Sequence, residues 1–320
     1  MNVYLDPEVR PLLTGLGATL TTASGVGFAL HTRYREGSTA AVIANLNARI
    51  RAWWVMIAVF AVVTIAGRPA MVIAYAAVSF FALREFVSLL PGRIADHDAL
   101  LASFFIALPA QYYLVATGWY GLFCVLLPVY GFLILPILSA LRADSQNFLA
   151  RAAETQWGVM ICIYCVSHVP ALLMLRISGF SDVDPRRAGL LVVYLVTVVQ
   201  ASDVLQYIWG KLLGRHKIAP DLSPSKTVEG FVGGAASAIV LGVVLAPITP
   251  FTRNQAAAMS AVIVLMGFLG GLVMSAIKRD LGVKDWGHSI SGHGGMLDRL
   301  DSICFSAPIF FHITRYFFTP

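Results

Sequence analysis

Long apolar stretches alternate with short polar ones along most of this 320-residue chain. A helix that crosses the hydrocarbon core of a bilayer, about 30 Å thick, needs about 20 predominantly apolar residues. The pattern predicts about ten transmembrane helices, near residues 11–31, 52–67, 69–89, 99–117, 119–140, 156–175, 188–209, 230–250, 255–276 and 293–316. Barrel strands would instead alternate in polarity over about ten residues. The expected fold is therefore an all-α, polytopic membrane protein.

Composition supports this prediction. The chain is 58% hydrophobic and 12% charged, whereas about a quarter of the residues of an average soluble domain are charged. Four cysteines are too few for a disulfide framework. Asp6 and Glu8 precede the first apolar stretch in place of a basic run, which favours a retained helix over a signal peptide.

The distribution of basic residues predicts the topology. With the N-terminus outside, Lys and Arg fall about twice as often in the inside loops, as expected for cytoplasmic loops. Loops near 210–229 and 277–293 are then cytoplasmic. The net charge of +6 is spread over such loops, which anionic lipid headgroups at the cytoplasmic face explain. We therefore expect the lipid bilayer, and no nucleic acid, as a partner.

Polar residues are unevenly divided between the two halves. Residues 1–154 form N-terminal transmembrane helices that we interpret as a scaffold or as lipid-facing. Residues 155–320 form the candidate catalytic region. Arg84 and Glu85 are the exception in the first half, and we interpret both as side chains that snorkel from the end of a helix. Cys162 and Cys165 lie within an apolar run, where ordinary packing is expected.

The first polar constellation begins at Asp203, an acid inside the apolar run 188–209. Buried acids in membrane helices are costly and often functional. A basic loop follows, with serine and threonine hydroxyls before a glycine-rich helix start, and such a segment can bind anions. Ser223 or Ser225 could equally cap the next helix, and the basic residues could be solvated positions of a cytoplasmic loop.

The second polar constellation spans residues 275–301. Asp298 and Asp301 are spaced i, i+3 and share one helix face, and Asp285 is available from the preceding loop. Mg²⁺ prefers a few carboxylates together with substrate phosphates and water, so the cluster suits a metal that bridges phosphate oxygens. The alternative is an ion-pair network with Arg299 and Lys284.

This second segment resembles the signature of the CDP-diacylglycerol synthases, also called phosphatidate cytidylyltransferases. The shared pattern is Ser-x-apolar-Lys-Arg, then Lys-Asp, then His-Gly-Gly-apolar-x-Asp-Arg-apolar-Asp, from Ser275 to Asp301. The stretch from Asp203 to Phe231 is also similar to a conserved loop of that family. The resemblance covers about the last 120 residues, and for the first half we claim no more than a shared multispanning character. Three positions depart from the family pattern, which is compatible with a divergent paralogue: Ser225, Val228 and Ser291.

The resemblance implies a Mg²⁺-dependent reaction of CTP with phosphatidic acid that yields CDP-diacylglycerol and pyrophosphate. The resemblance leaves open whether a second, monovalent cation also takes part. The implied metal ligands are Asp203, Asp285, Asp298 and Asp301. The implied catalytic residues are Lys278, Arg279, Lys284, Asp285 and Asp298. The implied substrate-binding residues are Arg215, Lys217, Ser223, Lys226, Thr227, His293, Gly294 and Gly295.

Two other functions stay open at this stage. One is a related CTP-dependent enzyme that acts on another lipid or a polyprenol. The other is a secondary transporter of an anionic solute, which should show matching broken helices in both halves. At the family level we also expect a homodimer. The expected location is the bacterial inner membrane, with the active-site loops in the cytoplasm.

Overall fold

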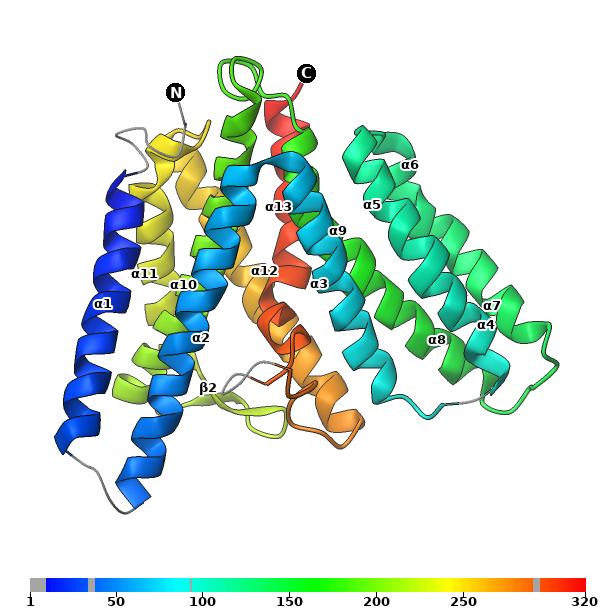
Figure 1. Ribbon diagram of the computed structural model, residues 1–320, viewed down its shortest axis with the longest axis horizontal. Helices are drawn as coiled ribbons and strands as arrows, with labels where there is room; N and C mark the ends of the chain where they lie inside the picture. Colours follow the sequence, from blue (N-terminus) through cyan, green and yellow to red (C-terminus); the bar gives the residue numbers. More distant parts are fainter. Residues whose placement is uncertain (1–9, 34–37, 93, 290–293) are drawn as a thin grey trace.

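The computed structural model describes residues 10–33, 38–92, 94–289 and 294–320, and Figure 1 shows a bundle of long helices with a small two-stranded sheet at one end. The α-helices are α1 (Arg10–Arg33), α2 (Ser38–Ala66), α3 (Arg68–Ser88), α4 (His97–Ala102), α5 (Leu108–Thr117), α6 (Tyr120–Val125), α7 (Phe132–Ala140), α8 (Phe148–Val159), α9 (Val166–Ala171), α10 (Ala188–Leu213), α11 (Val228–Val244), α12 (Arg253–Asp280) and α13 (Asp301–Phe318). Strands β1 (Lys217–Ala219) and β2 (Ser223–Thr227) pair antiparallel.

Seven helical segments in the described part of the chain are long and apolar enough to cross a membrane. They are Ile43–Ala66, Arg68–Ser88, Ile94–Thr117, Tyr120–Ala140, Phe148–Met174, Pro185–Leu213 and Arg253–Asp280. The all-α, polytopic prediction is confirmed. A helix lies near each of the ten predicted places, but α1, α11 and α13 are shorter or less apolar than the seven, and α11 has only 17 residues.

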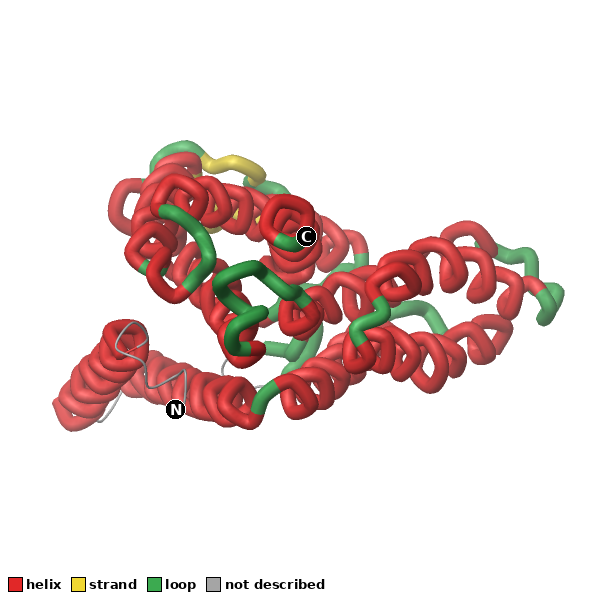
Figure 2. Tube along the Cα trace, turned by 90° about the horizontal axis from the view of Figure 1, so that it is seen from above, coloured by secondary structure: helices red, strands yellow, loops and turns green. Residues whose placement is uncertain are grey.

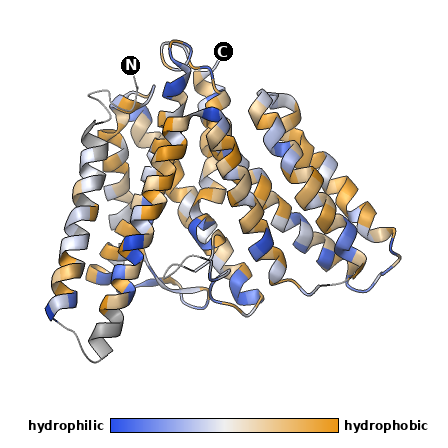
Figure 3. Cartoon of the chain, viewed as in Figure 1, coloured by the Kyte–Doolittle hydropathy of each residue, from blue (hydrophilic) through white to orange (hydrophobic). Residues whose placement is uncertain are grey.

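The helices form three groups in space. Figures 1 and 2 show α1 and α2 as a hairpin at one side of the molecule, α4 to α8 at the other, and α3 with α9 to α13 between them. The predicted division at residue 154 lies inside α8. The helices are coloured mostly as hydrophobic in Figure 3, and many large apolar side chains on them are exposed, as expected for helices that face lipid.

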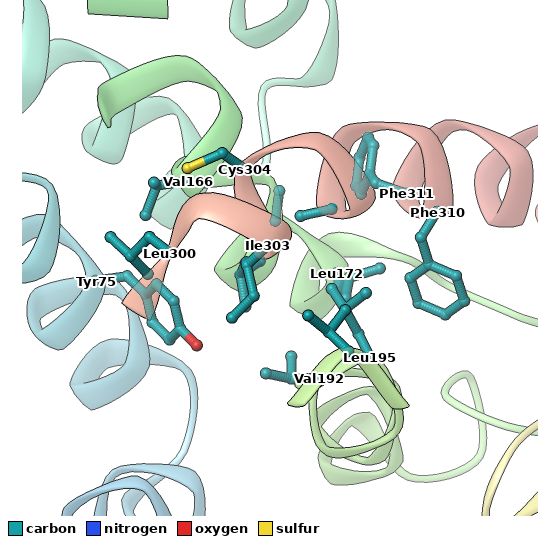
Figure 4. Packing of buried hydrophobic residues seen from close by; sticks show 14 of the residues in the cluster. Tyr75, Val166, Leu172, Val192, Leu195, Leu300, Ile303, Cys304, Phe310 and Phe311 are labelled. Carbon is teal, nitrogen blue, oxygen red and sulfur yellow. The ribbon is translucent and has the colours of Figure 1, made fainter. Parts of the chain in front are cut away.

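The central group shares one apolar core. Figure 4 shows side chains from α3, α9, α10 and α13 meeting there, among them Tyr75, Val166, Val192 and Ile303. Cys162 is fully buried in the same core and carries a free thiol, in line with the packing role expected for it. The core fixes α10 and α13, the two helices that carry Asp203 and Asp301.

Glycines set the distance between α10 and α11. A Cβ atom on Gly230 would lie 2.8 Å from the Gln206 carbonyl oxygen, and one on Gly234 would lie 2.5 Å from the Gln206 nitrogen. Small residues allow two membrane helices to approach this closely. The glycine-rich start of α11 therefore serves helix packing and places the end of β2 beside the C-terminal part of α10.

Local capping explains where α11 and α12 begin. The Thr227 hydroxyl accepts a hydrogen bond from the Gly230 nitrogen at 3.1 Å, so Thr227 caps α11, in place of Ser223 or Ser225. Thr252 and Gln255 form a reciprocal capping box at the start of α12. α12 ends just before Gly282, whose φ of 69° suits glycine.

Candidate active site

A polar cavity of about 320 Å³ lies where α10, β2, α11, α12 and the start of α13 meet. Its volume is at the lower end of the range of small-molecule sites, roughly 300–1,000 Å³. It is lined by Asp203, Gln206, Tyr207, Ser223, Ser225, Lys226, Thr227, Gly230, Phe231, Phe268, Gly271, Ser275, Asp298, Arg299, Asp301 and Ser302. Both polar constellations of the sequence therefore contribute to one cavity.

Three of the four predicted carboxylates line this cavity. Asp203 comes from the middle of α10, Asp301 from the first residue of α13, and Asp298 from the short 3-10 helix Leu297–Arg299 between the loop and α13. Asp203 and Asp301 lie close enough to interact electrostatically. Two neighbouring carboxylates repel one another, so a cation between them would lower their energy.

Lys226 brings a positive charge to the same place. Its ammonium lies 4.8 Å from the centre of the Phe268 ring and 3.4 Å from the Phe268 carbonyl oxygen. A Cβ on Gly271 would be 2.7 Å from Nζ, so this glycine makes room for the lysine. Burial lowers the pKa of Lys226, and the Asp203 and Asp301 carboxylates oppose that shift. Lys226 is thus a partly desolvated cation beside two acids.

Asp298 has a second set of partners. Its Oδ1 lies 2.9 Å from Lys278 Nζ, and its Oδ2 accepts hydrogen bonds from the backbone nitrogens of Trp286 at 2.8 Å and Gly295 at 2.9 Å. Asp298 therefore closes the loop between α12 and α13 as well as lining the cavity. Its cation partner is Lys278, and not Arg299 or Lys284 as in the ion-pair alternative.

Several predicted residues lie outside the cavity lining. Arg279 is exposed and contacts the Leu222 carbonyl oxygen at 3.4 Å, which ties α12 to the β1–β2 turn. Lys284 and Asp285 are exposed on the loop. Gly294 and Gly295 contact the Asp298 carboxylate, and the φ of Gly294 is 81°. His293, like Ser291, lies outside the described residues.

Arg215 and Lys217 are also exposed and outside the lining. The Glu229 carboxylate accepts hydrogen bonds from the backbone nitrogens of Arg215 at 2.9 Å and His216 at 3.2 Å. The link between α10 and β1 is therefore fixed by Glu229, and the two basic side chains extend from it.

Sequence reasoning missed an aromatic wall of the cavity and one acid outside it. Tyr207, Phe231 and Phe268 line the cavity, and only the spacing of Tyr207, four residues after Asp203, could have indicated one of them. Arg84 is exposed, and for it snorkelling stays a prediction, but the snorkelling interpretation is wrong for Glu85. Glu85 instead accepts hydrogen bonds from the backbone nitrogens of Met296 and Leu297, each at 2.9 Å.

The donor set suits a metal that is completed by substrate. Among the described residues, no group of three or more His, Cys, Asp or Glu side chains is arranged to hold a metal ion by itself. Asp203 and Asp301 nevertheless lie together in a cavity with hydroxyl groups. Mg²⁺ commonly binds through one or two carboxylates, with substrate phosphates and water as the remaining ligands. The cavity fits that mode of binding.

Comparison with known proteins agrees with this geometry. Residues 47–317 match the model of the cytidylyltransferase family. An Escherichia coli K12 protein with the name "Uncharacterized protein YnbB" is 36% identical over 273 residues, which are 85% of this chain and 88% of the relative. The phosphatidate cytidylyltransferase of Staphylococcus haemolyticus is 36% identical over 168 residues, which are 52% of this chain and 62% of the relative. That of Staphylococcus aureus strain COL is 30% identical over 196 residues, which are 59% of this chain and 74% of the relative. The chain belongs to the cytidylyltransferase family and is a nucleotidyltransferase.

Proposed function

We propose that this protein transfers the cytidylyl group of CTP to phosphatidic acid and forms CDP-diacylglycerol and pyrophosphate. The observation that carries the proposal is one cavity, among membrane helices, that combines Asp203, Asp301 and the half-buried Lys226. Relatives that carry the name phosphatidate cytidylyltransferase support the choice of acceptor.

The reaction requires no covalent intermediate with the protein. An oxygen of the lipid phosphate attacks the α-phosphorus of CTP, the bond from that phosphorus to the bridging oxygen of the β-phosphate breaks, and pyrophosphate leaves with the electron pair. Such transfers are catalysed mainly by positioning and by neutralisation of phosphate charge. Lys226 and Arg299 supply positive charge within the cavity, and the Ser223 hydroxyl supplies a hydrogen-bond donor.

The carboxylates would serve this chemistry by holding a metal ion. Asp203, Asp298 and Asp301 would hold Mg²⁺, with a second, monovalent cation as a further option. A bound Mg²⁺ would neutralise charge on the triphosphate as it develops during transfer. Without a cation, three carboxylates in the cavity would repel the phosphates that Lys226 and Arg299 attract, so the acids and the phosphates both require a bound cation as counter-charge.

The position of the cavity suits a lipid acceptor and a soluble nucleotide. Tyr207, Phe231 and Phe268 give it an apolar wall, and the outward faces of α10 and α11 carry exposed apolar residues such as Ile208 and Val232. A lipid could therefore enter laterally while its phosphate reaches Lys226. Because CTP is made in the cytoplasm, the cavity should open to that side of the inner membrane.

The proposal can be tested with purified protein in mixed micelles of detergent and phosphatidic acid, with Mg²⁺ and CTP labelled at the α-phosphate. We expect labelled CDP-diacylglycerol and equimolar pyrophosphate, and no product when EDTA replaces Mg²⁺. Parallel reactions with CTP labelled at the γ-phosphate and with a polyprenol separate a kinase from a cytidylyltransferase. Label transfer from the γ-phosphate, or no lipid product with any acceptor, would contradict the proposal.

A further inference from the structure

The last turn of α3 contacts the loop that carries the candidate catalytic residues. Glu85 Oε1 accepts a hydrogen bond from the Met296 nitrogen at 2.9 Å and another from the Ser289 hydroxyl. Its Oε2 accepts one from the Leu297 nitrogen at 2.9 Å. One carboxylate from the N-terminal half thus binds two consecutive backbone N–H groups at the start of the helix Leu297–Arg299.

The loop is shaped to receive this carboxylate. A Cβ on Gly287 would lie 3.0 Å from Glu85 Cδ, and a Cβ on Gly295 would collide with Glu85 Oε2. Gly294 needs its lack of a side chain because its φ is positive. Gly295 does not have a positive φ. A glycine is needed at this position because Glu85 approaches it too closely for a side chain. Two separate constraints therefore require the two consecutive glycines.

Phe86, the next residue of α3, holds another side of the same loop. Its ring stacks on that of Trp286 with the centroids 5.4 Å apart and the planes 26° apart. Trp286 is only 1% exposed, although it lies between the exposed residues of the loop. Two adjacent α3 residues thus fix the loop at two points, one through charge and one through aromatic packing.

The loop residues that α3 contacts bind or directly precede two residues of the cavity lining. The backbone nitrogens of Trp286 and Gly295 both donate to Asp298 Oδ2, and Asp298 and Arg299 follow directly after Leu297. A shift of the Met296–Leu297 backbone would move both cavity residues. Displacements of about 1 Å at a reacting centre can lower rates by about 100-fold.

We propose that Glu85 is a positioning residue that holds Asp298 and Arg299 in the cavity by binding the backbone at Met296 and Leu297. The inference rests on the proposed cytidylyl transfer for its effect on rate, but its structural content is independent of the substrate. It also gives the N-terminal half a part in the active site, since α3 supplies the contact.

The test is hydrogen exchange combined with steady-state kinetics on the full-length protein in detergent. For Glu85→Ala we expect exchange in peptides that cover 294–300 to become at least roughly tenfold faster, with exchange in α12 unchanged. We expect kcat to fall about 100-fold while KM for CTP changes by less than about threefold. Glu85→Gln keeps one carbonyl oxygen as an acceptor and should be intermediate in both measurements.

Arg84→Gln is the matched control, because Arg84 is exposed on the same turn of α3. It should leave exchange and turnover at wild-type values. Wild-type exchange of 294–300 in both Glu85 variants, or faster exchange with wild-type kcat, would overturn the positioning role. If Glu85→Ala does not fold, the comparison of Glu85→Gln with Arg84→Gln decides the question. Failure of the unmodified protein to form any CDP-lipid would instead contradict the proposed function, and the exchange comparison would still report on the contact.

Discussion

Two clusters of charged side chains lie among the helices, and they differ in what completes them. In the Arg151 cluster, Arg151 pairs with Asp96 at 3.1 Å and with Asp144 at 2.9 Å, and donates to the backbone carbonyl oxygens of Asp144 and Gln146. In the Asp203 cluster, formed by Asp203, Lys226 and Asp301, two acids and one cation line an accessible cavity. The first cluster is filled by partners from the protein, with Arg151 Nε in an ion pair with Asp96 but without a hydrogen bond, whereas the second has room for a ligand.

The partners of a charged side chain distinguish structural from functional charge more clearly than its burial does. The Arg151 side chain is only 5% exposed, so burial alone would mark it as a site candidate. Its fixed partners instead indicate that it connects α8 to the start of α4 and to the preceding turn. Buried ion pairs of this kind are costly to break but add little when complete. The Asp203 cluster should therefore affect turnover and the Arg151 cluster stability.

Arg151→Met should produce the largest loss of stability. It leaves Asp96, with a side chain 10% exposed, without its cation, and removal of one partner from a buried pair costs about 3–5 kcal/mol. The measurement is thermal or denaturant unfolding in detergent. Arg151→Met/Asp96→Leu should recover much of the loss, because no buried charge then lacks a partner. A single variant as stable as the wild type would remove the distinction between the clusters.

Asp301→Asn should have the opposite profile. We expect turnover of CTP to fall by about 10²–10³-fold, because a carboxylate that would hold the metal is lost. The melting temperature should stay equal or rise, since the substitution removes repulsion between Asp301 and Asp203. Activity and melting are measured on the same preparation. A large fall in melting temperature, or activity close to the wild type at saturating Mg²⁺, would contradict the role assigned to Asp301.

Lys226 should link the Asp203 cluster to pH. Burial lowers its pKa, so the ammonium loses its proton at a lower pH than an exposed lysine, whose pKa is about 10.4. CTP binding should therefore weaken as the pH rises toward that value. The unfolded chain holds this proton more tightly, so the contribution of Lys226 to the free energy of unfolding rises over the same pH window.

Lys226→Met tests this linkage. It should raise KM for CTP by about tenfold, since one charged contact to phosphate is lost, and should flatten the alkaline part of the KM profile. KM is measured from neutral to alkaline pH for both proteins, with Asp301→Asn as a comparison that retains the lysine. An unchanged alkaline rise of KM in Lys226→Met would assign the titration to another group.

The sequence predicted the Asp203 cluster well, because a charged residue inside an apolar run is costly to bury and is often functional. Asp203, Lys226 and Asp301 all stand out as candidate site residues in the sequence alone. The aromatic wall could not be found in this way, because Phe231 and Phe268 are ordinary residues of a membrane helix. Their position depends on which helices pack together, and apolar runs carry little information about that choice.

The error at Glu85 has a different cause. An acid near the end of an apolar helix can reach water or bind another segment, and the local sequence is the same in both cases. Its partners, Met296 and Leu297, are more than 200 residues away in the chain and donate through backbone nitrogens. Backbone donors have no side-chain signature. The lengths of the apolar runs likewise predicted the helices correctly. They gave about ten membrane-spanning helices, whereas seven described helical segments are long and apolar enough to span a membrane. Two of the others, α11 and α13, carry small or polar residues that serve packing and chemistry.

Arg142→Gln should have the smallest effect and thereby test whether burial or pairing controls the stability of charge in this protein. Arg142 makes two hydrogen bonds to the Asp98 carboxylate, at 2.7 Å and 2.8 Å, so its pairing geometry is as good as that of Arg151. Its side chain is 50% exposed, however, and water can replace the lost partner of Asp98. We expect the free energy of unfolding to fall by less than about 1 kcal/mol, with a smaller difference at high salt, and turnover to stay at the wild-type value. A loss as large as that of Arg151→Met would show that pairing geometry, and not desolvation, sets the cost, and the contrast between closed and open clusters would then need another basis.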